Sequence, residues 1–494
     1  MRERITSPVS KFFNEEVIMP ETIKDFEANI KEALSTQRAY AIMLTETGIV
    51  DKASGKSILE GLEYVEHTLN SHNLKGELED LFYNIETTMI EKTGLQIGGK
   101  LHTGRSRNDI GSTLNRLELR RSLVIIFDYL IKLQSVLLEK AEKEKDIVIT
   151  GYTHTQPAQP ITMGYYYSAV LEALERDFTR LQAAYINTNR CPYGAAAFAG
   201  ASFPLDREML AKLLGFDEVL ENALDCIASK DFLLETEMAF SNLAVTLSRV
   251  AQDLYMWSTD EFGLLDVGGE VAVCSSIMPQ KKNPAGLEYV KAKAAHPIGA
   301  LMGCLASLKN IPFSNNIDIH EALWFFEESF NETRKVIGMM TECLKYSKIN
   351  EDTAYNRAAS NYSTVTGLAD TLVKRCGLSF REAHHIVGSM VLETIESKQG
   401  IAGMTGALLS EISREFLGRE ICLSDEEIKN VLEPRNNIES KETFGGPQQA
   451  SVNKMLLRSA DKLNEEKAWY GEVVQRLKSA SALMREKEAA IRNN

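Results

Sequence analysis

A serine and a lysine stand six residues apart in the segment CSSIMPQKKNP (274–284), a combination that suits base chemistry on a loop. A lysine ammonium near a serine hydroxyl favours the charged form of that hydroxyl and drives it toward the alkoxide. Ser275 is therefore a candidate base and Lys281 a candidate activating cation. Gly268 and Gly269 precede the segment and would allow it to move. A glycine-hinged surface loop with ordinary lysines is the alternative that this segment alone leaves open.

A second polar segment, LHTGRSRNDIGSTLNR (101–116), places arginines and hydrogen-bonding side chains at the predicted start of a long helix. Ser106, Arg107 and Asn108 would crowd near that helix amino terminus, which is a natural site for a carboxylate. A solvated helix cap with two surface arginines would have the same spacing.

The third polar segment is GYTHTQPAQP (151–160), a proline-bounded turn that precedes another predicted helix. It carries Thr153, His154 and Gln156. A single histidine in a turn is more often an ordinary hydrogen-bonded side chain than a catalyst, so this segment gains meaning only beside the other two.

Together the three segments supply what a β-elimination next to a carboxylate needs. Removal of a Cβ proton builds a second negative charge on that carboxylate, so the site needs cations and donors there, a base, and an acid for the leaving group. Arg107, Lys281 and Asn283 fit the first role, and Ser275 fits the second. Because the residues come from three different helical regions, a junction between subunits is favoured.

The elements that must position these residues are predicted to be almost all helical. Proline, which breaks helices, is absent from 21–156, 205–278 and 313–433. Apolar residues recur at helical spacing in five long stretches, the first of which would extend roughly 50 Å. The stretches are 108–145, 163–188, 230–260, 285–309 and 318–347.

We therefore predict an all-α, three-domain chain with a long central helix bundle. The predicted domains are 1–104, 105–353 and 354–494, the last a small helical domain. The apolar stripe around Leu123 to Phe127 is so wide that we expect other subunits to complete the bundle.

Composition limits the kind of partner. The net charge of −14 argues against nucleic acid or an anionic membrane surface as the main partner. The seven cysteines stand singly, so we expect a reduced cytoplasmic protein with neither a disulfide framework nor a zinc site. The first residues show no apolar signal-peptide core, and no apolar run reaches the ~20 residues of a membrane span.

Beyond these patterns, the segments resemble a known family. CSSIMPQKKNP is similar to the signature loop of the fumarase/aspartase superfamily of lyases. LHTGRSRND and GYTHTQPAQP resemble the argininosuccinate lyase branch. The resemblance extends over most of the chain from about Glu79 and includes 200–216, 247–263 and 380–388.

The resemblance implies a fold and an activity. Four subunits of such enzymes assemble into a homotetramer with a twenty-helix bundle, and each active site forms from three subunits. These enzymes split an N-substituted aspartate into fumarate and an amine or guanidine, with neither metal nor cofactor. Argininosuccinate, cleaved to arginine and fumarate, is the default substrate that the resemblance implies.

It also implies roles for individual residues. Ser275 matches the base, and Lys281 and Asn283 match the residues that stabilise the aci-carboxylate intermediate. His154 matches the second region, and Glu288 matches the partner that orients and charges the histidine. Substrate-contacting positions of the family match Ser106, Arg107, Asn108, Thr153, Gln156, Ser276, Met278, Asn315 and His320.

The chain departs from the family pattern where the amine end of the substrate is held. The run NNIDIHEAL (315–323) stands where YNKDLQEDK is usual, so Asn315, His320 and Leu323 replace tyrosine, glutamine and lysine. Phe82 replaces the usual histidine of EDxH. Cys274 and Ala285 replace glycine and aspartate, and a WGGRF-type opening is missing.

Three alternatives therefore stay open. The first is a lyase of the same branch that acts on an aminopolycarboxylate such as ethylenediamine disuccinate. The second is a non-catalytic, crystallin-like relative, against which the retained Ser275 and His154 argue. The third is cleavage of adenylosuccinate or ammonia release from aspartate, from which TGRSRND and QKKN point away.

Overall fold

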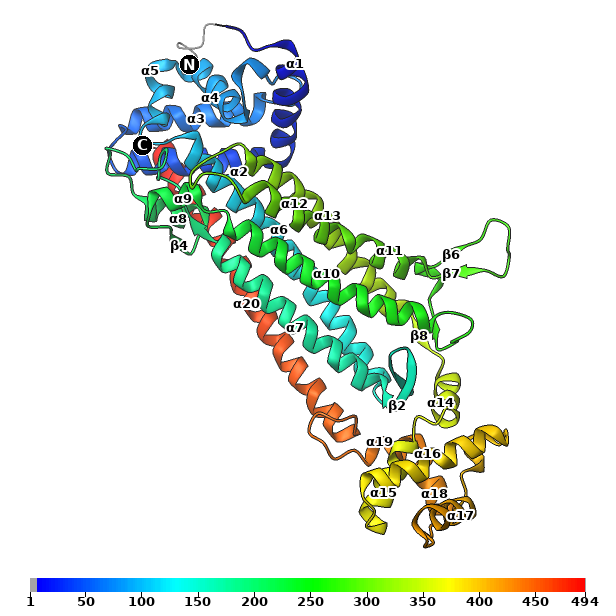
Figure 1. Cartoon of the computed structure of the whole chain (residues 1–494). Helices are drawn as coiled ribbons and strands as arrows, with labels where there is room; N and C mark the ends of the chain where they lie inside the picture. Colours follow the sequence, from blue (N-terminus) through cyan, green and yellow to red (C-terminus); the bar gives the residue numbers. More distant parts are fainter. Residues whose placement is uncertain (1–6, 494) are drawn as a thin grey trace.

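The computed structural model describes residues 7–493 as an elongated, almost wholly helical molecule (Figure 1). A group of helices from the first part of the chain forms one end, a bundle of long helices forms the middle, and a small helical group forms the other end. The all-α prediction is confirmed. No helix of residues 7–493 is long and apolar enough to cross a membrane.

The helices of the first group pack around one apolar core that includes Tyr40, Leu59 and Met89. They are α1 (Lys11–Phe13), the π-helical η1 (Asn14–Ile18), α2 (Met19–Glu46), α3 (Lys52–Thr68), α4 (Leu81–Thr93) and α5 (Leu95–Gly98). The short helices α8 (Arg207–Leu214) and α9 (Ala223–Ala228) lie beside this end of the bundle (Figure 1).

The central bundle contains the five long stretches that the periodicity predicts, with one break. Its helices are α6 (Arg107–Glu144), α7 (Met163–Thr188), α10 (Asp231–Trp257), α11 (Ala285–Lys293), α12 (Ala295–Leu308) and α13 (Asp318–Tyr346). The predicted helix 285–309 is divided at Ala294. Pro297 explains the break, because it has no N–H to bond the carbonyl of Lys293 one turn earlier.

The longest helix of the bundle, α6, starts at a reciprocal hydrogen-bonded cap. The Ser106 hydroxyl accepts from the backbone N–H of Asn108 at 3.3 Å, and Asp109 accepts from the N–H of Ser106 at 2.9 Å. Such a capping box stabilises the first turn. It fixes Arg107 and Asn108 in that turn.

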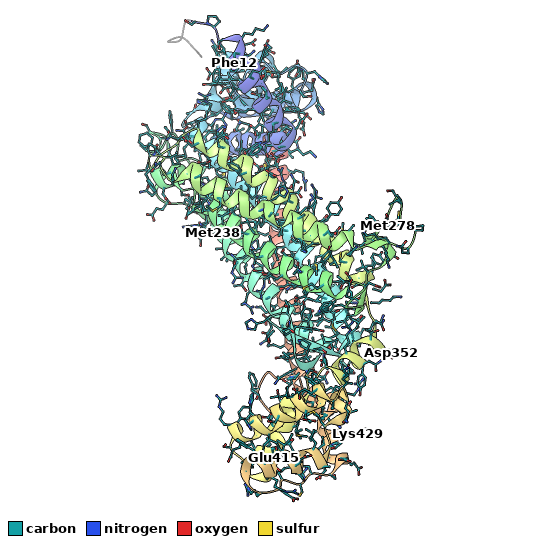
Figure 2. All side chains as sticks on the ribbon, turned by 45° about the vertical axis from the view of Figure 1, so that its right-hand side comes forward. Phe12, Met238, Met278, Asp352, Glu415 and Lys429 are labelled. Carbon is teal, nitrogen blue, oxygen red and sulfur yellow. The ribbon has the colours of Figure 1, made fainter. Side chains whose placement is uncertain are left out.

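The wide apolar stripe of α6 is covered within the chain rather than by other subunits. Leu123, Ile126 and Phe127 are fully buried in the isolated chain because α7, α13 and α20 (Gln449–Asn493) surround α6. Exposed apolar side chains lie instead on α10 and α12, including Met238 at 43% and Met302 at 63% exposure (Figure 2).

Helix α20 differs from the expected small domain over 354–494. It runs from the distal end along α6 and α7 back to the first helical group (Figure 1). Trp469 lies on it with its ring 4.9 Å from that of Phe127 and 5.5 Å from that of Tyr185. Its buried positions are Val452, Leu456, Ser459, Leu463, Glu466, Val473 and Ile491. From Val452 to Glu466 the steps alternate between four and three, and Val473 follows seven residues later, a heptad pattern that suits packing along another long helix.

The distal group has its own apolar core, which includes Leu368, Ile386 and Ile428. Its helices are α14 (Glu351–Ser360), α15 (Val365–Cys376), α16 (Phe380–Glu396), α17 (Gly406–Leu417), α18 (Asp425–Leu432) and α19 (Pro434–Glu439).

Short strands at both functional loops are the main addition to the helical prediction. Antiparallel β1 (Val148–Thr153) and β2 (Gln156–Thr162) form a hairpin after α6. Antiparallel β6 (Val273–Cys274) and β7 (Lys282–Asn283) form the base of a loop before α11. Two further pairs join β3 (Arg190–Cys191) to β4 (Glu218–Val219) and β5 (Leu265–Asp266) to β8 (Lys348–Ile349).

Candidate active site

The amino end of α6 holds Arg107 between two carboxylates. Its Nη1 lies 2.9 Å from Oδ2 of Asp80 and 3.2 Å from Oε2 of Glu79. The guanidinium also stacks over the ring of Tyr83, 4.5 Å from its centroid. Arg107 is thus pre-oriented by charge and by the aromatic face while part of it stays exposed, as an anion-binding arginine requires.

Asn108 and Asn315 meet at the same place although 207 positions separate them in the sequence. Nδ2 of Asn315 donates to Oδ1 of Asn108 at 3.1 Å, and Nδ2 of Asn108 donates to the carbonyl of Ala197 at 3.0 Å. Because the second bond fixes the Asn108 amide, Asn315 is held beside the capped end of α6.

A cavity of about 650 Å³ opens beside these residues, and we name it the α6 pocket. It lies between the first helical group, the start of α6 and the segment before α13. Its polar lining consists of Glu21, Asp25, Gln37, Glu79, Asp80, Arg107, Asn108, Asn315, Asn316 and His320. Its apolar lining includes Val9, Phe13, Val17, Ile18, Phe82, Ile85, Ile110 and Leu114.

The second predicted segment forms the tip of the β1–β2 hairpin. His154 and Thr155 occupy its two turn positions with φ of 52° and 60°. Two consecutive left-handed residues are typical of the tight turn whose twist matches a β-hairpin. Thr153 pairs with Gln156 across the turn, and both side chains are exposed together with His154. The hairpin therefore presents all three predicted residues to the outside of this chain.

The third segment is a projecting loop that folds around the hydroxyl of Ser275. The Ser275 Oγ accepts backbone N–H groups from Met278 at 3.0 Å and from Ile277 at 3.3 Å. Two amide donors on one oxygen favour its deprotonated form. The loop stands away from the bundle, with Ile277 82% exposed (Figures 1 and 2).

The two lysines of the loop differ. Lys282 forms an ion pair with Asp266 at 2.8 Å, which ties β7 to the body of the molecule. Lys281 has no ion-pair partner among residues 7–493, and its backbone N–H donates to the carbonyl of Met278 at 3.1 Å. Within the described chain Ser275 is therefore held by backbone amides rather than by the Lys281 ammonium, and that ammonium is free to meet a substrate.

The glycines before the loop act differently from each other. A Cβ on Gly268 would lie 2.7 Å from the carbonyl oxygen of Tyr346, so Gly268 permits a close approach to the end of α13. Gly269 has open space around it. Only Gly269 therefore fits the expectation that glycines allow this segment to move.

Glu288 lies in the first turn of α11, where its Oε1 accepts from the hydroxyl of Tyr255 at 3.2 Å. Asn283 is half-buried at the end of β7 and pairs with Val273. The described chain shows no contact between Glu288 and His154, so the expected carboxylate–histidine pair does not form within one chain.

One chain cannot bring the three segments together. Arg107 begins α6, and the hairpin follows its other end, so its 38 residues separate them by roughly 57 Å. Asn315 precedes α13, whereas Gly268 packs on Tyr346 at the far end of that helix. The loop with β6 and β7 therefore lies at the end of the bundle away from the start of α6 (Figure 1).

Comparison with known proteins defines the class first. A family model described as Lyase matches residues 3–299. The long bundle, the serine-bearing loop and the capped arginine segment thus belong to a lyase of the fumarase/aspartase superfamily. A second model, described as Argininosuccinate lyase C-terminal, matches residues 362–439.

Full-length relatives then define the family. Argininosuccinate lyase 1 of Shouchella clausii is 38% identical over 466 residues, which cover 94% of each chain. Argininosuccinate lyase of Methanocaldococcus jannaschii is 37% identical over 472 residues, which cover 95% of this chain and 96% of the relative. The chain belongs to the argininosuccinate lyase family and is a fumarate-forming carbon–nitrogen lyase.

A solved structure shares the whole architecture. The crystal structure of EDDS lyase in complex with formate has a TM-score of 0.88 and 30% identity, and the match covers 99% of this chain and 97% of that chain.

Sequence reasoning missed several groups that complete these sites. Glu79 and Asp80 form ion pairs with Arg107 and belong to the same EDLF segment as Phe82. They were missed because 27 or more positions separate them from Arg107 in the sequence. The backbone amides around Ser275 have no side-chain signal, although the turn residue Pro279 indicates a tight bend there.

Proposed function

We propose that this protein cleaves argininosuccinate to arginine and fumarate by β-elimination. Full-length similarity to enzymes of that name supports the substrate. The observation that carries the chemistry is the pair of backbone amides on the Ser275 hydroxyl. They stabilise the alkoxide form of Ser275, which is the form that can remove a proton from carbon.

In this proposal Ser275 removes the Cβ proton and the neighbouring carboxylate takes up the developing charge. Lys281 and Asn283 bind that carboxylate, because the Lys281 ammonium is unpaired within residues 7–493 and Asn283 lies at the base of the same loop. Charge stabilised in this way at a closed, dry site lowers the barrier strongly. Ser276 and Met278 lie on the exposed loop and close over the substrate.

The second carboxylate of the aspartyl part binds at the start of α6. Arg107 supplies the charge, and Asn108 together with the Ser106-capped amino terminus supplies donors. Asn315 and His320, which line the same α6 pocket, are assigned to the amine part. Thr153 and Gln156 add polar contacts from the hairpin.

Protonation of the leaving nitrogen is assigned to the region of His154. Its place at the tip of an exposed hairpin suits a group that reaches into a neighbouring subunit. In that neighbouring subunit, Glu288 would pair with the histidine and orient it. A carboxylate beside the ring favours its charged form, which can act as an acid.

We further propose a homotetramer with active sites at subunit junctions. The distance between the segments within one chain supports it, as do the exposed apolar side chains of α10 and α12. The seven cysteines are all free, which supports a reducing, cytoplasmic location.

Subunit complementation tests the shared site. Ser275→Ala and Arg107→Ala chains, each inactive alone, are expected to regain part of the activity when mixed and reassembled. The reason is that some mixed sites contain neither change. Sedimentation should give the mass of four chains. Activity that stays absent in mixed tetramers would contradict a site built from several subunits.

A second candidate is an aminopolycarboxylate lyase of the same branch. The similarity in fold to EDDS lyase and the replacement of three amine-end residues favour it. Absorbance of fumarate on adding argininosuccinate, ethylenediamine disuccinate, adenylosuccinate or aspartate separates the candidates. No fumarate from any of them, with a folded tetramer, would favour the non-catalytic alternative.

A further inference from the structure

Glu288 has a tyrosine and a lysine beside it that the proposed elimination does not use. Glu288 lies in the first turn of α11, which packs against α10, and its Oε1 accepts from the Tyr255 hydroxyl at 3.2 Å. Lys291 follows about one turn later on α11, with its Nζ 4.2 Å from the centroid of the Tyr255 ring. One aromatic side chain thus contacts both charged groups, the carboxylate at its hydroxyl and the ammonium on its face.

Lys291 lies away from the carboxylate that its position in the helix would let it reach. Glutamate and lysine three residues apart on a helix share a face and commonly pair. Lys291 nevertheless forms no ion pair with Glu288, or with any other carboxylate of residues 7–493. Its ammonium lies over the ring of Tyr255, whose negative face attracts a cation. The Glu288 carboxylate is therefore left without a cation from its own helix.

The Tyr255 hydroxyl is a dependable donor to that carboxylate. Its hydrogen bond to Glu288, together with the negative charge of Glu288, raises the pKa of the phenol above its usual value. A single donor on Oε1 fixes the rotation of the carboxylate. Among residues 7–493, Oε2 of Glu288 has no hydrogen-bond partner, so that oxygen stays open to a group from outside the chain.

Other charged groups on the surrounding elements already have partners. Helices α10, α12 and α13 pack against α11, and β7 precedes it. The pairs are Asp253 with Tyr166, His296 with Glu328, Lys282 with Asp266, and Glu332 with both Lys293 and Lys335. Lys291 is thus the cation of α11 that could reach Glu288 if the ring of Tyr255 were removed.

We infer that Tyr255 is a positioning residue that orients the Glu288 carboxylate and keeps Lys291 away from it, so that Glu288 can pair with the histidine of a neighbouring subunit. This inference rests on the proposed function, in which His154 protonates the leaving nitrogen. A carboxylate beside the imidazole favours its charged form. An ion pair between Lys291 and Glu288 would compete for that carboxylate, and the histidine would lose its proton at lower pH.

The pH profile of kcat for fumarate release from argininosuccinate by the whole enzyme tests the inference. Tyr255→Phe keeps the ring and removes the donor, so kcat should fall about fivefold while the basic limb of the profile stays in place. Tyr255→Leu removes the ring as well. Lys291 should then pair with Glu288, and the basic limb should move about half a pH unit lower.

A second substitution in the Tyr255→Leu chain separates this role from a merely structural one. Lys291→Met should return the basic limb to its wild-type position, because no ammonium is left to pair with Glu288. Lys293→Met is the matched control on the same helix, since Glu332 already binds its ammonium, and the limb should stay displaced. Tyr255→Met, whose flexible side chain adapts to the same gap, replaces Tyr255→Leu if that chain does not fold.

Two results overturn the inference and leave the proposed function intact. One is a basic limb that does not move when the ring of Tyr255 is removed, and the other is a displaced limb that Lys291→Met does not restore. A basic limb that is unchanged in His154→Gln overturns the assignment of the acid in the proposed function, and the inference falls with it.

Discussion

In the proposed mechanism, the amino end of α6 and the loop 275–281 serve one reaction, but the two regions are built in opposite ways. Arg107, Asn108 and Asn315 are locked by ion pairs and hydrogen bonds that come from distant parts of the same chain. Among residues 7–493, the loop is held by hydrogen bonds of its own backbone and by the ion pair of Lys282, and it projects from the bundle. In the proposed tetramer, substrate recognition is therefore preformed in one subunit, and the base is supplied by another subunit on a projecting loop.

The largest effect is expected from Ser275→Ala. Loss of the general base should lower kcat by about 10²–10⁴-fold. KM and the melting temperature should change little, because the side chain lies on an exposed loop outside the core. Fumarate formation and thermal unfolding measure both. Full kcat in this variant would show that Ser275 is not the base.

A smaller loss is expected from Arg107→Lys. Lysine keeps the charge but cannot bond Asp80 and Glu79 in the same fork or stack on Tyr83, so the preformed end would loosen. We expect kcat/KM to fall about 10–100-fold, chiefly through KM. Steady-state kinetics on argininosuccinate provides the measurement. An unchanged KM would show that recognition does not depend on the locked geometry.

The scaffold between the two regions has a pH-sensitive point at Glu237 of α10. Its side chain is fully buried, and burial raises its pKa from 4.5 to about 8, while a hydrogen bond with Ser329 opposes that shift. The folded chain thus holds a proton that the unfolded chain releases. Its stabilising effect is complete below about pH 4.5 and is lost as pH rises toward 8.

Glu237→Gln keeps the shape and stays neutral, so it should remove this slope. Urea unfolding at pH 5 and pH 8 should show that the wild type loses about 2–4 kcal/mol more of its free energy of unfolding than the variant does. Equal losses in the two proteins would mean that Glu237 does not bind the proton.

The smallest effect is expected from Asn315→Ala. It removes one hydrogen bond to Asn108, which retains its bond to Ala197. A net loss of about 1 kcal/mol corresponds to roughly a fivefold rise in KM, with kcat nearly unchanged. A much larger loss of kcat would show that Asn315 acts on the reacting atoms.

Local chemistry could be predicted from the sequence, but long-range packing could not. Residue types indicate a helix start near Asn108, a turn within 151–160 and a glycine-preceded loop at 274–284, and all three are present. The cap itself is Ser106, the turn belongs to a β-hairpin, and the amides that bind Ser275 have no side-chain signal. The approach of Asn315 to Asn108 depends on how the bundle folds, so no local pattern encodes it. The packing of α20 along α6 was not expected either, because two of its buried positions, Ser459 and Glu466, are polar and weaken the apolar heptad in the sequence.

That last helix also sets an order of events during synthesis. The aromatic cluster of Phe127, Phe178 and Tyr185 closes only when Trp469 is added to it. More than three hundred residues follow Phe127 before Trp469 leaves the ribosome, so the bundle spends most of translation with an uncovered apolar groove. The nascent chain is therefore expected to bind chaperones. A chain that ends before residue 449 should be insoluble rather than merely inactive.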